Sequence, residues 1–363
     1  MTPRIVLTGA GGFLGWHVRV LARALRIPEP TVVGRDVLAS PQRLADVIHG
    51  ADRVIHMAGI NRGEPNELAA GNVALARRLA EGVRACGTPP KKVVFANSVQ
   101  AGNGTPYGDG KAAAAALLAE TTRWFGAEFD DIPLPNLFGE HGRPHYNSVI
   151  ATFCRVLVDG GTPQVSGDRE LDLLHATDAA GLLLGVRVGD EPVPTMRRTV
   201  RELADRLGRF AAVYRQGEIP ELADRFDVRL FNTYRSHLRP APLPITRHAD
   251  ARGALVEAVK VHSGGGQTFC SSTVPGATRG QHFHLAKVER FVVVRGEAEI
   301  SMRRVLHDEV LRFRVSGDEP VVVDMPTMWA HSITNIGDDE LTTLFWSQDL
   351  FNPCKPDTYA EAV

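Results

Sequence analysis

The spacing of hydrophobic residues divides the chain into two parts with different predicted folds. Before residue 239, short apolar runs that predict buried strands alternate with segments whose apolar residues recur at helical spacing. Such alternation is typical of a doubly wound α/β domain with a parallel sheet, which we assign to residues 1–238. A proline-rich break at residues 239–244 then precedes short strands separated by glycine and proline turns. Residues 239–363 are therefore predicted to form an all-β barrel. The predicted strands of the first part are residues 5–7, 31–33, 54–59 and 93–98, and its helices include residues 16–21, 72–87 and 149–158.

Composition and charge bear on which kinds of partner and which compartment the sequence predicts. The chain has 363 residues, of which 44% are hydrophobic and 23% are charged, and its formal net charge is −1. This charge predicts neither nucleic acid nor an anionic membrane as a partner, and no apolar run approaches the roughly 18 residues of a membrane span. The N-terminal residues resemble a strand and turn rather than a signal peptide. Four scattered cysteines without CxxC spacing favour a cytoplasmic, reducing compartment.

A glycine-rich turn follows the first predicted strand. In TGAGGFLG, the residues Gly9, Gly12 and Gly15 have the spacing of a dinucleotide fingerprint, and Phe13 and Leu14 open the next helix. Glycines at these positions allow a tight turn and a close approach to a pyrophosphate, at which the N–H groups of the helix point. We therefore predict that these five residues bind a dinucleotide cofactor.

The ends of the second and third predicted strands bear on which dinucleotide binds. An acidic residue at the end of the second strand usually binds the ribose hydroxyls of NAD, whereas an arginine can meet the 2′-phosphate of NADP. Arg35 precedes Asp36 here, so we predict NADP(H) and keep NAD as the alternative. Arg35 can also be a solvated loop residue. Ala58 and Gly59, which end the third strand, are predicted to lie beside the adenosine half.

The fourth strand and the helix after it carry a candidate catalytic group. Ser98 ends the strand, and Tyr107 and Lys111 follow at a Tyr-x-x-x-Lys spacing that places both on one helix face. The tyrosine hydroxyl can give a proton to a carbonyl oxygen while hydride reaches the carbon. The ammonium lowers the pKa of the tyrosine and can bind the cofactor ribose, and the serine can orient the carbonyl. These residues predict reduction of a carbonyl with NAD(P)H.

With these motifs, residues 1–238 resemble the extended short-chain dehydrogenase/reductase family, which has a Rossmann-type sheet. The resemblance implies that Ser98, Tyr107 and Lys111 are the catalytic residues. Gly110 departs from the YxxSK pattern of the family, at a position that carries no proton. Ser98 is followed by Val-Gln-Ala rather than by the Asp-Glu pair of the family's nucleotide-sugar dehydratases. The sequence therefore favours ketone reduction over elimination of water.

A polar segment before the helix at residues 149–158 is a candidate substrate site. Asn136 lies in PNLFG, and Arg143, Tyr146 and Asn147 lie in HGRPHYN. In extended reductases this region contacts the nucleotide sugar, so the resemblance implies that these residues bind substrate. A diphosphate needs a cation, and Arg143 is the candidate. An incidental surface arginine is the alternative.

Histidines cluster in the barrel part. His282 and His284 are two residues apart, so both side chains leave the same face of a strand. Glu289 opens the next apolar run, which we predict to pair with that strand, and His331 follows the turn at Pro326. Two imidazoles and a carboxylate on adjacent strands, with a third imidazole, predict a site for zinc or another divalent metal. The order Gly-x-His-x-His-(four residues)-Glu resembles the motifs of the cupin family, a small antiparallel barrel with a metal in its mouth.

The barrel part also resembles the RmlC-type sugar-nucleotide epimerases. Asp250-Ala-Arg-Gly resembles their D-x-RG segment, which implies that Arg252 and Glu257 contact substrate. Arg279-Gly-Gln-His resembles their RGxH segment, whose histidine removes a proton next to a ketone. His282 is therefore either a metal ligand, which we favour, or a general base.

Nearly the whole chain resembles the CapF/WbjC family of bifunctional capsular-polysaccharide enzymes, through MAGINR, NSVQA, PNLFG, TRGxHxH and the closing PDTY. The resemblance implies a nucleotide-diphosphate sugar as substrate and a homodimer. It implies that the cupin epimerises carbon 3 of a UDP-2-acetamido-2,6-dideoxy-4-hexulose. The reductase part would then reduce the 4-ketone with NADPH, giving UDP-N-acetyl-6-deoxy-L-talosamine on the route to N-acetyl-L-fucosamine.

Two other functions remain open. A 4-ketoreductase acting on a dTDP-linked or other deoxysugar can carry a cupin without a catalytic role. Gly34 in place of an acid, and Pro133-Leu134 without an arginine before the PN pair, allow such a different substrate. The third function is an NADP(H)-binding regulatory protein. An intact set of Ser98, Tyr107 and Lys111 argues against it, because a sensor needs no catalytic residues.

Overall fold

The chain forms two compact units. The structure is a computed structural model that describes residues 3–188, 195–251, 253–262 and 265–363. Residues 150–168 and 200–238, which we expected in the α/β domain, group with the barrel. The predicted domain boundary after residue 238 stays a prediction. The first unit comprises residues 1–138, 142–149 and 169–199, and the second comprises residues 139–141, 150–168 and 200–363.

A parallel sheet forms the centre of the first unit. Its order is β2-β1-β3-β4-β5, and every neighbouring pair is parallel. The chain adds β2 on one side of β1 and β3 on the other, so the turn after β1 lies at a topological switch point, where such sheets bind ligands. The strands are β1 (Ile5–Thr8), β2 (Thr31–Val33), β3 (Arg53–His56), β4 (Lys92–Ser98) and β5 (Glu128–Leu134).

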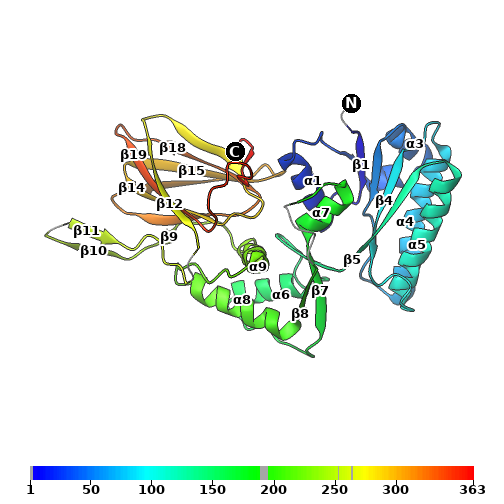
Figure 1. The fold of residues 1–363 in the computed structure, drawn as a ribbon, viewed down its shortest axis with the longest axis horizontal. Helices are drawn as coiled ribbons and strands as arrows, with labels where there is room; N and C mark the ends of the chain where they lie inside the picture. Colours follow the sequence, from blue (N-terminus) through cyan, green and yellow to red (C-terminus); the bar gives the residue numbers. More distant parts are fainter. Residues whose placement is uncertain (1–2, 189–194, 252, 263–264) are drawn as a thin grey trace. The chain divides into compact units, whose positions relative to one another are not determined.

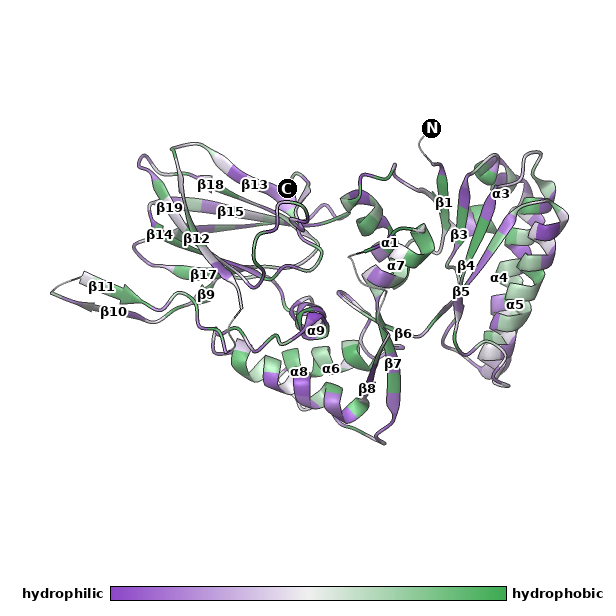
Figure 2. Ribbon diagram, viewed as in Figure 1, coloured by the Kyte–Doolittle hydropathy of each residue, from purple (hydrophilic) through white to green (hydrophobic). Residues whose placement is uncertain are grey.

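Helices cover both faces of this sheet (Figure 1). α1 packs against α7 on one face, and α3, α4 and α5 pack together on the other. On the latter face, buried Leu44, Leu79 and Leu118 of the three helices meet Val54 and Phe95 of the sheet. The strands β1 and β4 are accordingly hydrophobic in Figure 2. The helices of this unit are α1 (Phe13–Ala24), α2 (Arg35–Leu38), α3 (Pro41–Ile48), α4 (Pro65–Ala85), α5 (Pro106–Trp124) and α7 (Ala176–Leu184).

A smaller sheet completes the first unit. β6 (Asn136–Phe138) runs parallel to β7 (Glu170–His175), and β8 (Met196–Thr199) runs antiparallel to β7. β7 leads directly into α7, whose first turn is capped by His175 through a hydrogen bond from the backbone nitrogen of Thr177. None of the helices in the described ranges is both long and apolar enough to cross a membrane.

The second unit contains two antiparallel sheets, which form the predicted all-β part. Their orders are β12-β19-β14-β17-β9 and β16-β15-β18-β13-β20. Buried side chains of both sheets share one core, with Phe291 and Phe345 from the first and Met302 and Ile333 from the second. The doubly wound α/β part followed by an all-β part is thus confirmed. The strands are β9 (Leu243–Pro244), β12 (Gln267–Thr273), β13 (Thr278–Phe283), β14 (Glu289–Arg295), β15 (Glu297–Arg304), β16 (Val310–Ser316), β17 (Val321–Met325), β18 (Trp329–Asn335), β19 (Leu341–Ser347) and β20 (Tyr359–Ala360).

Further elements of the second unit lie outside these sheets. β10 (Arg247–Asp250) and β11 (Gly253–Val256) form an antiparallel hairpin of their own. The helices of this unit are α6 (Val149–Val158), α8 (Val200–Tyr214) and α9 (Arg225–Arg235). α9 begins at the N-cap Asp224, whose side chain accepts a hydrogen bond from the backbone nitrogen of Asp227 at 2.8 Å. Such a cap satisfies one of the N–H groups that a helix start leaves unpaired.

The pairing predicted for the strand that begins at Glu289 is wrong. We expected it to pair with the strand of His282 and His284. β14 instead pairs with β17 and β19, whereas β13 pairs with β18 and β20. Both edges of β13 are thus occupied, so the chain crosses to the opposite sheet through residues 284–288. Glu289 therefore faces the histidines from the other sheet rather than from an adjacent strand.

A buried ion pair connects α8 to the barrel. Arg290 binds Asp324 through Nε–Oδ1 at 2.7 Å and Nη2–Oδ2 at 2.9 Å. Tyr214, the last residue of α8, donates its hydroxyl to the same carboxylate at 2.7 Å, and Arg290 also donates to the Gly217 carbonyl at 2.6 Å. Burial raises the pKa of Asp324, but the charge and hydrogen bonds of Arg290 outweigh it and hold this pKa below its usual range. The carboxylate is therefore charged and depends on its partner.

Replacing Arg290 by Met is expected to lower the free energy of unfolding of the barrel by about 3–5 kcal/mol, because the Asp324 carboxylate then stays buried without its partner. Arg312→Met is the matched control. Arg312 is exposed and lies 3.7 Å from Glu299, and such surface pairs contribute about 0–1 kcal/mol. Urea unfolding followed by tryptophan fluorescence measures both variants. Equal midpoints for the two would contradict the expectation.

Candidate functional site

The glycine-rich turn after β1 leaves almost no room for side chains. Gly9 has a φ of +73°, and a Cβ on it would lie 2.6 Å from the backbone nitrogen of Ala58. A Cβ on Gly15 would lie 2.4 Å from the carbonyl oxygen of Gly9. The turn thus packs against the end of β3, and α1 packs against the turn. This is the close helix–strand packing that the fingerprint glycines make possible.

The start of α1 fits a dinucleotide phosphate. Gly12 is the N-cap residue, and no side chain caps the first turn. A Cβ on Gly11 would meet no atom within 4 Å, so the backbone is open on this side. Phe13 and Leu14, which begin the helix, are partly buried. Free N–H groups at a helix N-terminus attract phosphate.

Arg35 and Asp36 have different surroundings after β2. Arg43 donates a hydrogen bond to Asp36 Oδ2 at 2.9 Å, which holds the pKa of Asp36 below its usual range. Arg35 is exposed and forms no ion pair within the described part of the chain. The cation of Arg35 is therefore available to a ligand, whereas the carboxylate of Asp36 already has a partner.

Ser98 and Tyr107 come from neighbouring elements. Ser98 ends β4, and Tyr107 lies in the first turn of α5, whose N-cap Thr105 accepts a hydrogen bond from the backbone nitrogen of Gly108 at 3.1 Å. Burial raises the pKa of Tyr107, and a hydrogen bond with Ser98 acts in the opposite direction. The phenol is therefore protonated at neutral pH and can donate a proton.

Lys111 is held one turn further along α5. It is 5% exposed, and its Nζ donates to the Ala96 carbonyl at 2.6 Å and lies 4.1 Å from the centre of the Phe95 ring. Burial lowers the pKa of Lys111 to about 8, while the charge of Asp131 acts in the opposite direction. The ammonium therefore titrates close to physiological pH.

The kcat/KM for NADPH is expected to fall above pH ~8, by up to about tenfold per pH unit, because this quantity reports the titration of the free enzyme and Lys111 loses its charge there. Lys111→Arg keeps a cation across this range. The variant is expected to be less active but flat between pH 7 and pH ~9.5. Initial rates of NADPH oxidation measure both profiles. A wild-type profile that stays flat to pH ~9.5 would exclude this role for Lys111.

Gly110, the departure from the YxxSK pattern, lies where two helices meet. A Cβ on Gly110 would lie 2.7 Å from Cα of Ala69 and 2.9 Å from its carbonyl oxygen, on α4. A serine there requires α4 to move. The absence of serine therefore follows from the close packing of α4 on α5 and leaves Tyr107 and Lys111 in place.

The predicted substrate residues of the loop after β6 lie beside Arg62. The guanidinium of Arg143 lies 4.8 Å from the centre of the Tyr146 ring, and that of Arg62 lies 5.8 Å from it. Asn147 donates to the Asn61 carbonyl at 2.8 Å. Two guanidinium groups thus lie near one exposed aromatic ring. Guanidinium groups can bind an anionic ligand through charge-assisted hydrogen bonds. The structure does not add Asn136 to this cluster: its side chain donates to the Asp172 carbonyl at 3.2 Å.

The four predicted metal ligands converge inside the barrel. One ligand atom from each of His282, His284, Glu289 and His331 lies within 4.8 Å of the others. Glu289 Oε2 lies 3.3 Å from His284 Nε2 and 3.6 Å from His331 Nε2. Burial raises the pKa of Glu289, but the nearby imidazoles of His284 and His331 outweigh it and hold this pKa below its usual range. Burial lowers the pKa of His282 to about 4 and also lowers that of His331. Glu289 is therefore a carboxylate, and His282 and His331 are neutral imidazoles, the protonation that metal binding requires.

The surroundings of these histidines also fit a metal. His284 Nδ1 lies 2.5 Å from the Asp357 carbonyl and His331 Nδ1 lies 3.2 Å from the Trp329 carbonyl. Such bonds fix the tautomer whose Nε2 lone pair is free for a metal. His331 Nε2 is buried and has no hydrogen-bond partner. A buried polar atom of this kind costs about 1–3 kcal/mol, which coordination would offset.

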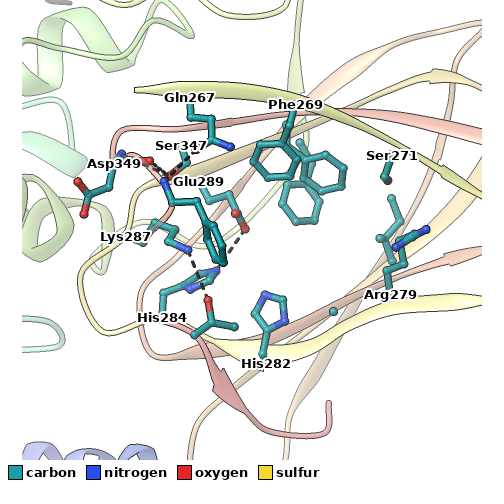
Figure 3. A pocket seen from close by; sticks show the side chains of 16 residues that line it. Gln267, Phe269, Ser271, Arg279, His282, His284, Lys287, Glu289, Ser347 and Asp349 are labelled. Carbon is teal, nitrogen blue, oxygen red and sulfur yellow. Dashed lines mark hydrogen bonds and ion pairs between the residues drawn. The ribbon is translucent and has the colours of Figure 1, made fainter. Parts of the chain in front are cut away.

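Three of the four candidate ligands, His282, His284 and Glu289, line a cavity of about 480 Å³ in the barrel. Figure 3 shows His282 and His284 on one side of it, Glu289 across from them, and Arg279 and Lys287 at separate places on the wall. Phe269 and Phe345 supply an aromatic wall, with parallel rings whose centres are 4.8 Å apart. The cavity has the size and the mixed aromatic and polar lining of a small-molecule site.

The D-x-RG resemblance implied two substrate residues, Arg252 and Glu257, of which the structure describes Glu257 alone. Arg252 lies outside the described residues. Glu257 is exposed, and its carboxylate pairs with Lys260 at 2.8 Å. It is not among the residues that line the cavity.

Several residues around the sites were not found from the sequence. Asn72 of α4 fixes the loop after β3, because its side chain bonds both the backbone nitrogen and the carbonyl of Ile60. His56 is fully buried, lies 2.7 Å from Thr8 Oγ1, and has its pKa lowered to about 3 by burial and by the charge of Lys111. These roles depend on contacts between distant segments. The PDTY motif, in contrast, is visible in the sequence, and it could have pointed to Asp357 as a residue near the site.

Comparisons with known proteins match this architecture. The model of the NAD-dependent epimerase/dehydratase family matches residues 5–187, and that of the polysaccharide biosynthesis C-terminal domain matches residues 248–359. The chain is 30% identical to a UDP-2-acetamido-2,6-β-L-arabino-hexul-4-ose reductase of Pseudomonas aeruginosa, over 99% of both chains.

The chain is also similar to proteins whose structures have been solved. The capsular polysaccharide assembling protein CapF of Staphylococcus aureus is 30% identical, with a TM-score of 0.58, over 99% of this chain and 100% of that chain. A UDP-N-acetylglucosamine 4-epimerase of Methanobrevibacter ruminantium shares the fold at 17% identity and a TM-score of 0.53, over 65% of this chain and 98% of that chain. The chain therefore belongs to the NAD-dependent epimerase/dehydratase family, among its CapF-like capsular-polysaccharide enzymes that modify nucleotide sugars.

Proposed function

We propose that this enzyme acts twice on one UDP-linked 2-acetamido-2,6-dideoxy-4-hexulose. The barrel epimerises carbon 3, and the α/β unit then reduces the 4-ketone with NADPH to give UDP-N-acetyl-6-deoxy-L-talosamine. The observation that carries the proposal is the convergence of three histidines and a glutamate inside the barrel, where two of the histidines and the glutamate line the cavity. A full-length relative named as a reductase of such a 4-ketosugar supports the substrate.

For the reduction, the residues of the α/β unit supply a proton and hold the cofactor. NADPH, bound at the turn of Gly9 and Gly12 with Arg35 at its 2′-phosphate, supplies the hydride. The protonated Tyr107 hydroxyl gives its proton to the oxygen of the former ketone as the alkoxide forms. Ser98 orients the carbonyl oxygen, and the Lys111 ammonium binds the ribose and favours the loss of the tyrosine proton.

For the epimerisation, a base removes the proton on carbon 3, which the adjacent 4-ketone makes acidic. Reprotonation on the opposite face inverts this carbon. A divalent metal held by His282, His284, Glu289 and His331 would stabilise negative charge on the ketone oxygen. Burial lowers the pKa of His282 to about 4, so its imidazole is neutral at pH 7. A neutral imidazole fits both of its open roles, ligand and base. The cations of Arg279 and Lys287 on the cavity wall favour an anionic substrate.

We further propose a homodimer as the active form. β12 is an edge strand of its sheet, and such edges pair readily with another chain. Light scattering coupled to size-exclusion chromatography measures the mass directly.

Solvent exchange tests the two steps separately. The UDP-4-ketosugar is incubated with enzyme in D₂O without NADPH, and NMR follows deuterium at carbon 3. Exchange is expected, followed by oxidation of NADPH when it is added. If NADPH is oxidised and no deuterium enters carbon 3, the barrel has no epimerase role. Parallel reactions with the dTDP-linked sugar decide the nucleotide.

A further inference from the structure

Asp357 holds the segment that carries His284. Its carboxylate accepts three backbone hydrogen bonds, from Leu285 and Ala286 at 2.9 Å and from Lys287 at 2.8 Å. Its own carbonyl lies 2.5 Å from His284 Nδ1. One residue thus contacts four consecutive residues, of which the first is a candidate metal ligand and the last lines the cavity.

The backbone at Asp357 is arranged for this contact. Its φ is +41°, in a region that aspartate and asparagine adopt more readily than most residues with a side chain. Two residues later the chain enters β20, which pairs with β13 so that Ala360 lies opposite His282 and Tyr359 opposite Phe283. Residues 357–360 therefore bind both the strand of His282 and the segment that follows it.

We propose that Asp357 is a positioning residue that orients His284 toward a divalent metal. By accepting the Nδ1–H of His284, its carbonyl selects the tautomer whose Nε2 faces Glu289, 3.3 Å away. Three N–H groups on one carboxylate form charge-assisted bonds that keep this carbonyl in place. The role rests on the metal centre of the proposed function, and it assigns a task to the closing PDTY motif.

Asp357→Asn tests this role. The amide keeps the size of the side chain and tolerates the positive φ, but it loses the charge and one acceptor oxygen. Zinc affinity, measured by competition with a chromophoric chelator, is expected to fall about 10–100-fold, as for other partners of metal-bound histidines. The visible spectrum of the Co²⁺-loaded protein is expected to change as well, because the position of a ligand changes. A residue that only stabilises the fold would alter neither measurement.

Asp318→Asn is the matched control, because Asp318 is an exposed carboxylate in the turn between β16 and β17. Its zinc affinity and Co²⁺ spectrum are expected to equal those of the wild type. Thermal unfolding with EDTA present shows whether the Asp357→Asn variant folds. If it does not, Asp357→Glu replaces it: this side chain keeps the charge one methylene further out and is expected to fold with weakened zinc binding.

The outcomes separate the two levels of the proposal. If the wild type binds zinc and a folded Asp357 variant binds it within twofold as tightly, the positioning role is wrong and the metal centre stands. If the wild type binds none of Zn²⁺, Co²⁺ and Mn²⁺ at the barrel, the metal centre is wrong and the role of Asp357 falls with it.

Discussion

Tyr107→Phe is expected to lower the kcat for reduction of the UDP-4-ketosugar by about 10²–10⁴-fold, because no other group then gives a proton to the forming alkoxide. The ring fills the same partly buried site, so the fold is expected to persist. Burial raises the pKa of Tyr107, so the hydroxyl is protonated at neutral pH and is the group that the substitution removes. NADPH oxidation in single-turnover experiments measures the chemical step directly.

Tyr359→Phe is the matched control for this substitution. Tyr359 lies in β20, its ring centre is 5.5 Å from that of Phe283, and its hydroxyl has no assigned role in catalysis. This variant is expected to reduce the sugar at the wild-type rate. Deuterium exchange at carbon 3 in Tyr107→Phe is expected to continue, since it takes place in the barrel. If Tyr107→Phe oxidises NADPH at the wild-type rate, the assigned proton donor is wrong. If no 4-ketosugar is reduced by the wild type, the regulatory alternative gains support.

Glu289→Gln is expected to slow deuterium exchange at carbon 3 by about 10³-fold or more, because the site loses its anionic ligand and with it the metal, which would supply several kcal/mol of stabilisation to the enolate. The carboxylate is the single anion of the ligand set and lies within 3.6 Å of both His284 and His331. An amide of the same size keeps the packing and removes the charge. Metal content, measured on the same sample, is expected to fall with the exchange rate.

Glu299→Gln is the matched control for the barrel. Glu299 lies on β15, outside the cavity lining, and its carboxylate is 3.7 Å from Arg312. Exchange and metal content are expected to remain at wild-type values. A Glu289→Gln variant that has lost its metal and still exchanges at the wild-type rate would show that catalysis needs only a general base. That result would favour the base role of His282 over its ligand role.

Local patterns predicted most of the fold because they depend on neighbouring residues. Gly9 and Gly15 indicate close approaches of the backbone, and the structure shows both: a Cβ on Gly9 would lie 2.6 Å from the nitrogen of Ala58, and one on Gly15 would lie 2.4 Å from the carbonyl oxygen of Gly9. Alternating apolar runs and helices likewise predicted the parallel sheet. The helix predicted at residues 72–87 is α4, which begins earlier, at Pro65, because proline is favoured in the first turn of a helix.

The pairing of β14 could not be predicted in the same way. A short connection between two strands usually indicates a hairpin, and residues 284–288 have that length. The outcome depends on β18 and β20, which come later in the chain and occupy both edges of β13. The four ligand residues nevertheless lie together, because Glu289 faces the histidines from the opposite sheet. Glu257 illustrates the opposite case: a family motif suggested substrate contact, and its partner in the fold is Lys260.

The contact of α8 with the barrel has a practical consequence for protein engineering. A fragment cut at the proline-rich segment, before Arg239, would lack Tyr214 and Gly217, which complete the coordination of the Arg290–Asp324 pair. The charges of Arg290 and Asp324, which are buried in the whole chain, would then be exposed on the surface of the fragment. A fragment intended to contain the barrel alone should therefore begin before Val200, so that it includes α8 and α9.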